Sequence, residues 1–184
     1  MRRIRPLLAG IAGLLAALAT APGRAEVTAS GPSGFSLRIE IPVAVAPRDA
    51  FSDFVRIGSW WNKEHTYSGD PPTHLTLDPR PGGCFCERLP NGGFVEHMNV
   101  VFSAPGKILR LAGGLGPLQA MGATGVMALQ FNADGPNTRL IMTYIVSGFA
   151  TGKGLAEIAP AVDGVLTDQL TRFKRFAETG KPTG

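Results

Sequence analysis

Charged residues are scarce in this sequence: Asp, Glu, Lys and Arg make up 17% of its 184 residues, whereas 44% are hydrophobic. The 18 basic residues outnumber the 14 acidic ones only because of Arg2, Arg3, Arg5 and Arg24 at the N-terminus. Beyond them the charges balance, and the basic cluster at 172–175 is typical of the solvated face of a helix. This pattern does not indicate nucleic-acid binding, so we expect no nucleic-acid partner.

Long hydrophobic runs are missing after the N-terminus. The apolar run at 7–18 follows a basic start and precedes small residues up to Ala25. This order predicts a cleaved export signal over residues 1–25, with cleavage after Ala25 and a periplasmic or secreted mature protein. The run is too short to span a bilayer comfortably, so we expect no integral membrane segment after cleavage.

Recognised cofactor and nucleophile motifs are also absent. The Gly-rich region 113–125 lacks the Lys and the following Ser or Thr of a phosphate-binding loop. No Ser-His-Asp set occurs in a recognisable nucleophile elbow. We therefore expect no cofactor, and we predict that region 113–125 forms a flexible loop at the entrance of a cavity. The sequence leaves protein partners open.

Cysteine is limited to Cys84 and Cys86. On a strand these residues share a face, and their Cα atoms lie roughly 6.5–7 Å apart, near or beyond the usual limit for a disulfide. We therefore favour two buried thiols. A disulfide, which export would permit, requires the backbone to buckle. A metal site with His65 or His97 would have an incomplete set of ligands, so we expect no metal.

The remaining pattern is a strand, a helix, a meander of strands and a closing helix. Residues 35–45 alternate apolar and polar side chains, as in a half-buried strand. Pro47 predicts the start of a helix that runs to about residue 57. The later strands are predicted at 75–78, 84–89, 94–103, 107–112, 126–131 and 139–147. The closing helix follows Pro160 and carries an apolar stripe. We expect a loose leader at 26–34 and a frayed tail at 180–184.

This order predicts an α+β fold in one domain over residues 35–179. A strongly twisted antiparallel sheet curls, and one long helix can lie across its concave side. Because a single helix cannot fill the whole concavity, we expect an internal cavity between the sheet and the closing helix.

Four sequence segments resemble a known group of proteins: Trp60-Trp61, EHTYSGD at 64–70, GGCFCE at 82–87 and APAVDGVL at 159–166. With the element order, they resemble the START-like or SRPBCC (helix-grip) superfamily, in particular a bacterial, polyketide-cyclase-like subgroup of uncharacterised function. The superfamily includes polyketide cyclases, aromatase/cyclases, plant pathogenesis-related allergens and a domain of the heat-shock-protein ATPase activator. The resemblance implies a curved antiparallel sheet around a long C-terminal helix over 35–179. It implies no catalytic set, because the superfamily includes carriers, lyases, cyclases and interaction domains.

The segment between residues 60 and 87 is rich in aromatic and reactive side chains, which is typical of a pocket wall. One of Trp60 and Trp61 is expected in the core and the other at the pocket mouth, because adjacent side chains cannot point the same way. The hydroxyl of Tyr144 is a candidate polar group inside the cavity. The candidate ligand-binding residues are Trp60, Trp61, His65, Tyr67, Cys84, Cys86, Met98, Met127, Met142, Tyr144 and Leu166.

The candidate catalytic residues are Glu96, His97 and Tyr144. Strand parity places Glu96 on the more apolar face, shared with Phe94, Met98, Val100 and Phe102, and we predict that this face lines the cavity. A carboxyl group there would have a raised pKa, useful to a general acid or base. The other register places His97 inward with Asn99. A further alternative pairs Glu96 with Arg88 or Arg110 in a structural ion pair.

Three functions remain open at this point. The favoured one is a periplasmic carrier or sensor that holds an apolar small molecule in the cavity. The second is an enzyme of the cyclase, dehydratase or hydrolase type that uses Glu96 or His97 in acid–base chemistry. The third is an interaction domain whose exposed aromatic segment docks on another envelope protein.

Overall fold

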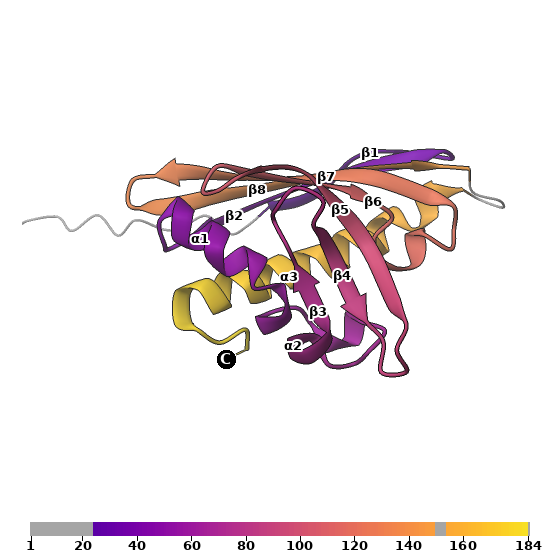
Figure 1. Ribbon diagram of the computed structural model, residues 1–184. Helices are drawn as coiled ribbons and strands as arrows, with labels where there is room; N and C mark the ends of the chain where they lie inside the picture. The colour runs from indigo at the N-terminus through magenta and orange to yellow at the C-terminus, as the bar shows by residue number, and fades with distance from the viewer. Residues whose placement is uncertain (1–23, 150–153, 184) are drawn as a thin grey trace, which may run out of the picture.

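The computed structural model describes residues 24–149 and 154–183, and it is built around one eight-stranded antiparallel sheet (Figure 1). The order of the strands in the sheet is β1-β2-β8-β7-β6-β5-β4-β3. The strands are β1 Arg24–Gly31, β2 Gly34–Val43, β3 Leu75–Leu77, β4 Cys84–Arg88, β5 Phe94–Ala104, β6 Ile108–Gly113, β7 Ala123–Asp134 and β8 Asn137–Gly148. The helices are α1 Pro47–Val55, α2 Pro71–His74 and α3 Ala159–Thr179, with 3-10 turns at Ile57–Ser59, Lys63–His65, Gly116–Leu118 and Leu155–Glu157.

Helix α3 lies across the concave side of the sheet. Figure 1 shows it in yellow beneath the long strands, with α1 beside it and β3 and β4 descending past it. Its apolar stripe is fully buried at Leu166, Leu170 and Phe173, and the helix contacts β1, β2 and α1. It ends before Gly180, which has a φ of 78° that glycine adopts without steric cost. The predicted α+β helix-grip fold is confirmed.

Strand β2 follows the alternation of its sequence. The inward residues Phe35, Leu37, Ile39 and Val43 are each at most 3% exposed. Pro42, which cannot donate a ladder hydrogen bond, lies past Glu40, the last residue of β2 that pairs with the described part of β1. The strand therefore buries one apolar face against α3.

The loose leader predicted at 26–34 is wrong. Residues Arg24–Gly31 form strand β1, which pairs with β2 from Arg24 opposite Glu40 to Gly31 opposite Gly34. Ala25 and Val27 pack against the core, and this burial stabilises the pairing. The predicted signal peptide covers residues 1–25, of which 1–23 lie outside the described residues. Its last two residues, Arg24 and Ala25, lie in β1, so cleavage after Ala25 would leave a mature strand that begins at Glu26.

Strand β5 contains two irregularities that change which side chains face inward. Phe85 of β4 pairs with Met98 and Cys86 pairs with Glu96, so His97 is an extra residue in the ladder. A second shift lies between Val100 and Phe102. Because a bulge inserts a residue, the alternation does not continue across it. His97 and Met98, although adjacent, are both buried, at 4% and 1% exposed.

The predicted cavity face of β5 is therefore wrong. Glu96 is exposed, Phe94 is 73% exposed and Phe102 is 47% exposed. The structural ion pair of Glu96 with Arg88 or Arg110 is also wrong. Arg88 donates to the Thr73 carbonyl, and Arg110 lies over the Phe102 ring. The Glu96 carboxylate accepts a hydrogen bond from Asn99 instead.

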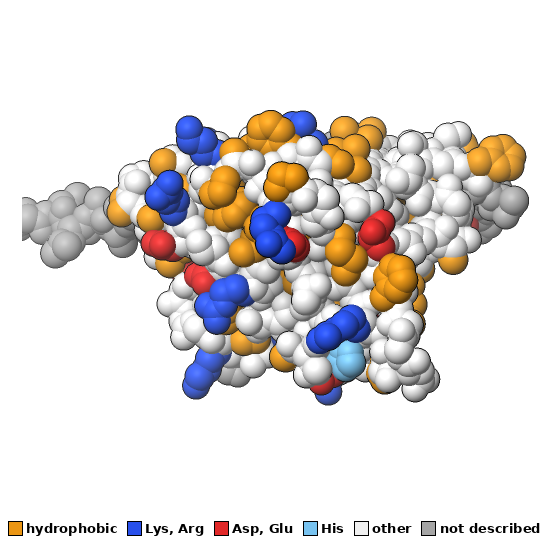
Figure 2. Space-filling model, in the orientation of Figure 1, with side chains coloured by type: hydrophobic (Ala, Val, Ile, Leu, Met, Phe, Trp, Pro, Cys, Tyr) orange, Lys and Arg blue, Asp and Glu red, His pale blue; other side chains and the backbone are white. Residues whose placement is uncertain are grey.

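The outer face of the sheet carries several exposed apolar side chains, among them Val101, Phe102, Val126 and Ile145. Figure 2 shows hydrophobic side chains along the upper edge of the molecule, with basic groups among them and further basic and acidic groups below. Within 24–149 and 154–183, no helix is both long enough and apolar enough to cross a membrane.

Candidate functional site

A pocket of about 380 Å³ lies between α3, the aromatic segment after α1, the loop before β7 and the bulged part of the sheet. Its volume is within the range of small-molecule sites. Most of the lining side chains are apolar, and the polar ones come mainly from the segment 64–67. The lining residues are Trp61, Glu64, His65, Thr66, Tyr67, Phe85, His97, Leu115, Gly116, Pro117, Leu118, Ile158, Ala161, Val162, Val165 and Leu166.

Helix α3 holds the start of the aromatic segment in place. The Arg172 guanidinium donates to the Trp60 carbonyl at 3.0 Å. The backbone N–H of Asn62 donates to the Gln169 side chain at 2.9 Å, and the Asn62 amide donates to Asp168 at 2.9 Å. These contacts fix where the chain leaves the core and passes to the pocket rim.

The two tryptophans occupy different environments. Trp60 is 1% exposed and packs on Phe54 and Phe173, with ring centroids 5.1 Å and 5.4 Å away. Trp61 is 8% exposed, lines the pocket and donates from Nε1 to the His65 carbonyl at 2.9 Å. Trp60 is therefore a core residue, and Trp61 forms pocket wall.

A chain of ring contacts runs from the core to the inner end of the pocket. Trp61 packs on Phe85 with ring centroids 5.2 Å apart, and Phe85 packs on His97 at 4.9 Å. The Tyr67 ring stacks nearly parallel to the His97 ring, with centroids 6.1 Å apart. The imidazole of His97 is thus held between aromatic rings, which restricts its orientation.

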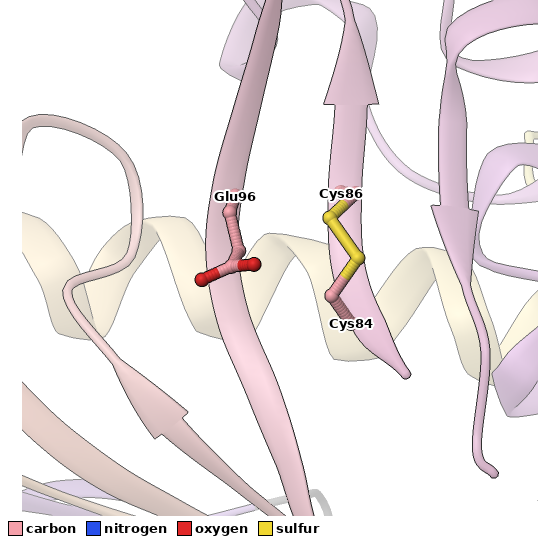
Figure 3. A group of neighbouring side chains, drawn as sticks. All are labelled: Cys84, Cys86 and Glu96. Atoms are coloured by element: carbon pink, nitrogen blue, oxygen red, sulfur yellow. A yellow bond between two sulfur atoms is a disulfide. The ribbon is translucent and has the colours of Figure 1, made fainter. Parts of the chain in front are cut away.

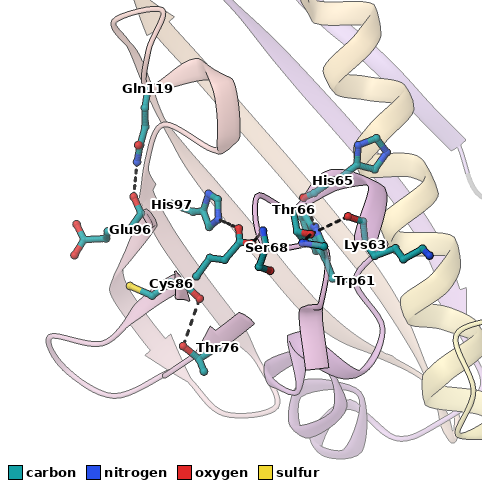
Figure 4. Close-up of polar contacts among 12 residues, drawn as sticks. Trp61, Lys63, His65, Thr66, Ser68, Thr76, Cys86, Glu96, His97 and Gln119 are labelled. Carbon is teal, nitrogen blue, oxygen red and sulfur yellow. Dashed lines mark hydrogen bonds and ion pairs between the residues drawn. The ribbon is translucent and has the colours of Figure 1, made fainter. Parts of the chain in front are cut away.

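The most unusual pair in the site is Glu87 with His97. Glu87 is fully buried, and its Oε2 lies 3.1 Å from Nε2 of His97. The other carboxylate oxygen, Oε1, accepts the Ser68 backbone N–H at 2.6 Å. Figure 4 shows the hydrogen bonds of His97 and Ser68 beside those of Thr66 and Gln119. Glu87 therefore joins three parts of the site: β4, the bulge of β5 and the segment after Trp61.

The charge states of the pair follow from this geometry. Burial alone would raise the pKa of the Glu87 carboxyl, but hydrogen bonds from Ser68, Tyr67 and His97 outweigh burial and lower it. Burial lowers the pKa of His97 from its ordinary value of 6.5, and Glu87 offsets this only in part. At neutral pH the carboxylate is therefore ionised and the imidazole is neutral.

The loop before β7 forms the opposite wall and is fixed by Tyr144. The Tyr144 hydroxyl accepts the Leu115 N–H at 3.2 Å and donates to the Gly113 carbonyl at 3.3 Å. Burial raises the pKa of this phenol to about 12, so the hydroxyl stays neutral. Gln119 also donates to the Glu96 carbonyl, which ties the loop to β5.

Gly113 allows β6 to lie close to the bulge. A Cβ atom at this position would lie 2.6 Å from the His97 carbonyl oxygen, closer than side chains approach. The glycine is therefore required for the close packing of the loop wall against the strand that carries His97.

The two cysteines form a disulfide, so the prediction of buried thiols is wrong. Their Cα atoms are 5.4 Å apart, shorter than in a regular strand, and the ladder shifts register between Phe85 and Cys86. Figure 3 shows the bond along β4 with Glu96 on the neighbouring strand. Although the sulfur atoms and the Glu96 carboxylate lie within 4.8 Å of one another, sulfurs bonded to each other are not thiolate ligands for a metal.

The candidate ligand residues named from the sequence divide into three groups. Trp61, His65, Tyr67 and Leu166 line the pocket together with the acid–base candidate His97. Trp60, Met98, Met127, Met142 and Tyr144 are buried but are not part of the lining. Cys84 and Cys86 alternate with the buried Phe85 and Glu87, so they face the opposite side of β4.

Sequence reasoning missed Glu87. The signal was present, because strand alternation that places Cys84 and Cys86 on one face places Phe85 and Glu87 on the other. Because Phe85 is a large apolar residue that is expected to face inward, the same alternation predicts that the Glu87 carboxylate faces inward as well.

Comparisons with known proteins support the fold and do not assign a function. No protein-family model matches the sequence, and no curated protein sequence matches it. The chain is similar in structure to the Aha1 dimer from Colwellia psychrerythraea, with 17% identity, a TM-score of 0.56 and coverage of 79% of this chain and 98% of the other. It is also similar to EF2215 from Enterococcus faecalis, a conserved protein of unknown function, with 13% identity, a TM-score of 0.56 and coverage of 82% and 75%.

A third similar structure is an uncharacterized protein from Rhizobium leguminosarum, with 18% identity, a TM-score of 0.54 and coverage of 84% and 99%. At such low identity the likeness shows a shared fold alone. The case for function therefore rests on this chain's own site.

Proposed function

We propose that this protein is an exported carrier or sensor that binds a mainly apolar small molecule between α3 and the sheet. The observation that carries the proposal is the pocket of about 380 Å³, whose deep walls are Trp61, Phe85, Leu118 and Leu166. Buried apolar surface provides the binding free energy, about 25 cal/mol for each Å² removed from water. The few polar groups in the wall would orient the ligand.

Export and family membership are part of the same proposal. The predicted signal peptide over 1–25 would direct the chain to the periplasm or the medium. The Cys84–Cys86 disulfide supports this location, because disulfides persist in oxidising compartments. We also assign the chain to the polyketide-cyclase-like subgroup of the START-like superfamily, a proposal that rests on the segments at 60–70, 82–87 and 159–166.

Native mass spectrometry of the mature protein, purified from the periplasm of its own host, tests the proposal. We expect an adduct with the mass of an apolar small molecule. Val165→Phe, which adds volume to the pocket wall, should remove the adduct. Ile145→Phe is the control, because Ile145 is 61% exposed on the outer face. A bare protein mass that persists after incubation with a lipid extract of the host would contradict the proposal.

A second candidate function is catalysis, and the Glu87–His97 pair favours it. A neutral imidazole whose Nε2–H is held by a carboxylate can accept a proton at its other nitrogen from a bound substrate. His97, and not the exposed Glu96, would then be the base. This function predicts turnover that rises with pH through the pKa of His97 and is lost in His97→Phe, whereas a carrier shows no turnover in either form.

The third alternative, docking on another envelope protein, does not draw support from the two tryptophans. Trp60 and Trp61 are 1% and 8% exposed, so neither presents its ring to a partner protein. A Trp60→Ala change would disrupt the core and would not report on docking.

A further inference from the structure

His97 has one hydrogen-bonding nitrogen that the fold does not use. Its Nε2 contacts Glu87 at 3.1 Å, whereas its Nδ1 is buried and has no hydrogen-bond partner. The ring as a whole is 4% exposed and lines the pocket. Buried polar atoms are nearly always hydrogen-bonded in folded proteins, so an unpaired one on a side chain that lines the pocket requires an explanation.

Because the partner of Nε2 is the Glu87 carboxylate, it determines which of the two His97 ring nitrogens carries the proton. An ionised carboxylate can only accept hydrogen bonds, so Nε2 of His97 must carry the proton and donate it to Glu87. In a neutral imidazole the other nitrogen then has a lone pair and no proton. Nδ1 is therefore a pure acceptor, and Glu87 fixes this tautomer.

The other polar groups of the pocket wall are satisfied or lie near the rim. Thr66 Oγ1 donates to the Lys63 carbonyl and accepts the Gly69 N–H. Glu64 and His65 are exposed, so water can satisfy their side chains. Among the lining residues, Nδ1 of His97 is the buried acceptor left for a ligand.

We propose that the pocket's ligand is an uncharged, mainly apolar molecule with a hydroxyl or N–H group, which donates a hydrogen bond to Nδ1 of His97. This inference rests on the proposed binding function and names the chemistry of the ligand. A molecule with only acceptors would place a lone pair against the Nδ1 lone pair and gain nothing there. Tyr67 covers one face of the imidazole and is 57% exposed, so its ring is the one free to move as the donor group approaches.

A matched pair of probes tests the inference by isothermal titration calorimetry at neutral pH. Para-pentylphenol and para-pentylanisole share an apolar body, but the phenol has a donor that methylation removes from the anisole. We expect the phenol to bind the wild-type protein about fivefold more tightly, which is the effect of one net hydrogen bond.

Glu87→Gln should remove that preference. The new amide oxygen can still accept the Ser68 N–H, but its NH₂ group then faces Nε2 of His97. Because an amide NH₂ is a donor, Nε2 must become the acceptor and the proton moves to Nδ1. The phenol-to-anisole ratio should fall to about one. Glu96→Gln is the matched control on the neighbouring strand, and it should keep the wild-type ratio because Glu96 faces outward.

If Glu87→Gln does not fold, His97→Phe serves in its place. It keeps the ring packing on Phe85 but has neither ring nitrogen, so the phenol-to-anisole ratio should again fall to about one. Equal affinities of the wild-type protein for the two probes would overturn this inference and leave the proposed function standing. An unchanged ratio in a folded Glu87→Gln or His97→Phe variant would also overturn it. If neither probe binds and the native protein carries no adduct, the proposed function fails as well.

Discussion

The sheet is regular where β2, β8 and β7 pair and irregular where β4, β5 and β6 pair. From Gly34 opposite Ser147 to Val43 opposite Thr138, β2 and β8 remain in one register, as do β7 and β8 along their whole pairing. The β1–β2 pair shifts once, between Val27 and Ala29. Toward the opposite edge β5 shifts register against both neighbours, and β4 carries a disulfide between residues two positions apart. The regular strands pack on helices α3 and α1, whereas the irregular strands hold the buried Glu87–His97 pair.

The difference indicates what each end of the sheet does. In a regular strand, alternation would place His97 and Met98 on opposite faces. The bulge turns His97 toward the interior, so it lies in the pocket wall beside Met98. A buried carboxylate is costly unless it is hydrogen-bonded, and here Ser68 and His97 meet that requirement for Glu87. Proteins often depart from local regularity at functional sites. The following predictions test whether the two ends respond differently to substitution.

The largest effect is expected at the regular end. Leu140 on β8 is fully buried, so Leu140→Ala should lower the free energy of unfolding by roughly 2–5 kcal/mol, as measured by urea denaturation. Ile145→Ala, on the same strand but 61% exposed, should change it by no more than about 0.5 kcal/mol. Similar losses for both variants would show that β8 does not pack as described.

At the irregular end the comparison is between two glutamates. Glu87→Ala leaves the buried Ser68 N–H and His97 Nε2 unpaired and should cost roughly 3 kcal/mol. Glu96→Ala removes an exposed carboxylate and should cost less than about 0.5 kcal/mol. Urea denaturation of both variants measures the contrast, and the reverse order would support the inward placement of Glu96 that the structure excludes.

The disulfide should have a smaller and local effect. Closing such a short loop is worth roughly 1–2 kcal/mol, so the double change Cys84→Ala with Cys86→Ala should lower stability by that amount. Amide hydrogen exchange should speed up in β4 and β5 and remain slow in β7 and β8. Faster exchange throughout the sheet would contradict a local role. A mass increase of two daltons on reduction, about one hydrogen per sulfur, verifies the bond itself.

The smallest effect is expected from pH. Because burial depresses the pKa of His97 in the folded state, the unfolded chain binds the proton more readily. Stability is therefore full above the ordinary histidine pKa of 6.5 and is lost as the pH falls through the lower folded value. Glu87 adds a loss of the same sign below its ordinary pKa of 4.5. The groups facing His97 are Glu87 and Tyr67, with Glu64 and His65 at the rim.

Urea denaturation at a series of pH values measures this dependence. In His97→Phe the part that begins near pH 6.5 should disappear, whereas the part due to Glu87 should remain at lower pH. An unchanged profile in that variant would contradict the buried neutral state of His97.

The regular end of the sheet could be predicted from the sequence because its pattern is local. Phe35, Leu37, Ile39 and Val43 alternate with polar residues, and this alternation alone indicates a half-buried strand. The apolar stripe of the closing helix likewise identified its buried face. Strand β1 was missed because Ala25 and Val27 are a weak apolar signal that depends on pairing with β2.

The irregular end could not be predicted in the same way, because a bulge is a property of two paired strands. Strict alternation places either Glu96 and Met98 or His97 on the inward face. In the structure the bulge places both His97 and Met98 inward and Glu96 outward. The disulfide depends on the same distortion, which brings the Cys84 and Cys86 Cα atoms to 5.4 Å. A single sequence does not show where such a distortion occurs.

The most direct test of the central claim is nitrogen NMR of the isotope-labelled histidine side chains, recorded at neutral pH with and without para-pentylphenol. We predict that the His97 ring is neutral with the proton on Nε2, and that the phenol shifts the signal of the unprotonated Nδ1 as a hydrogen bond forms. A proton on Nδ1, or an Nδ1 signal that does not change when the phenol binds, would contradict the account.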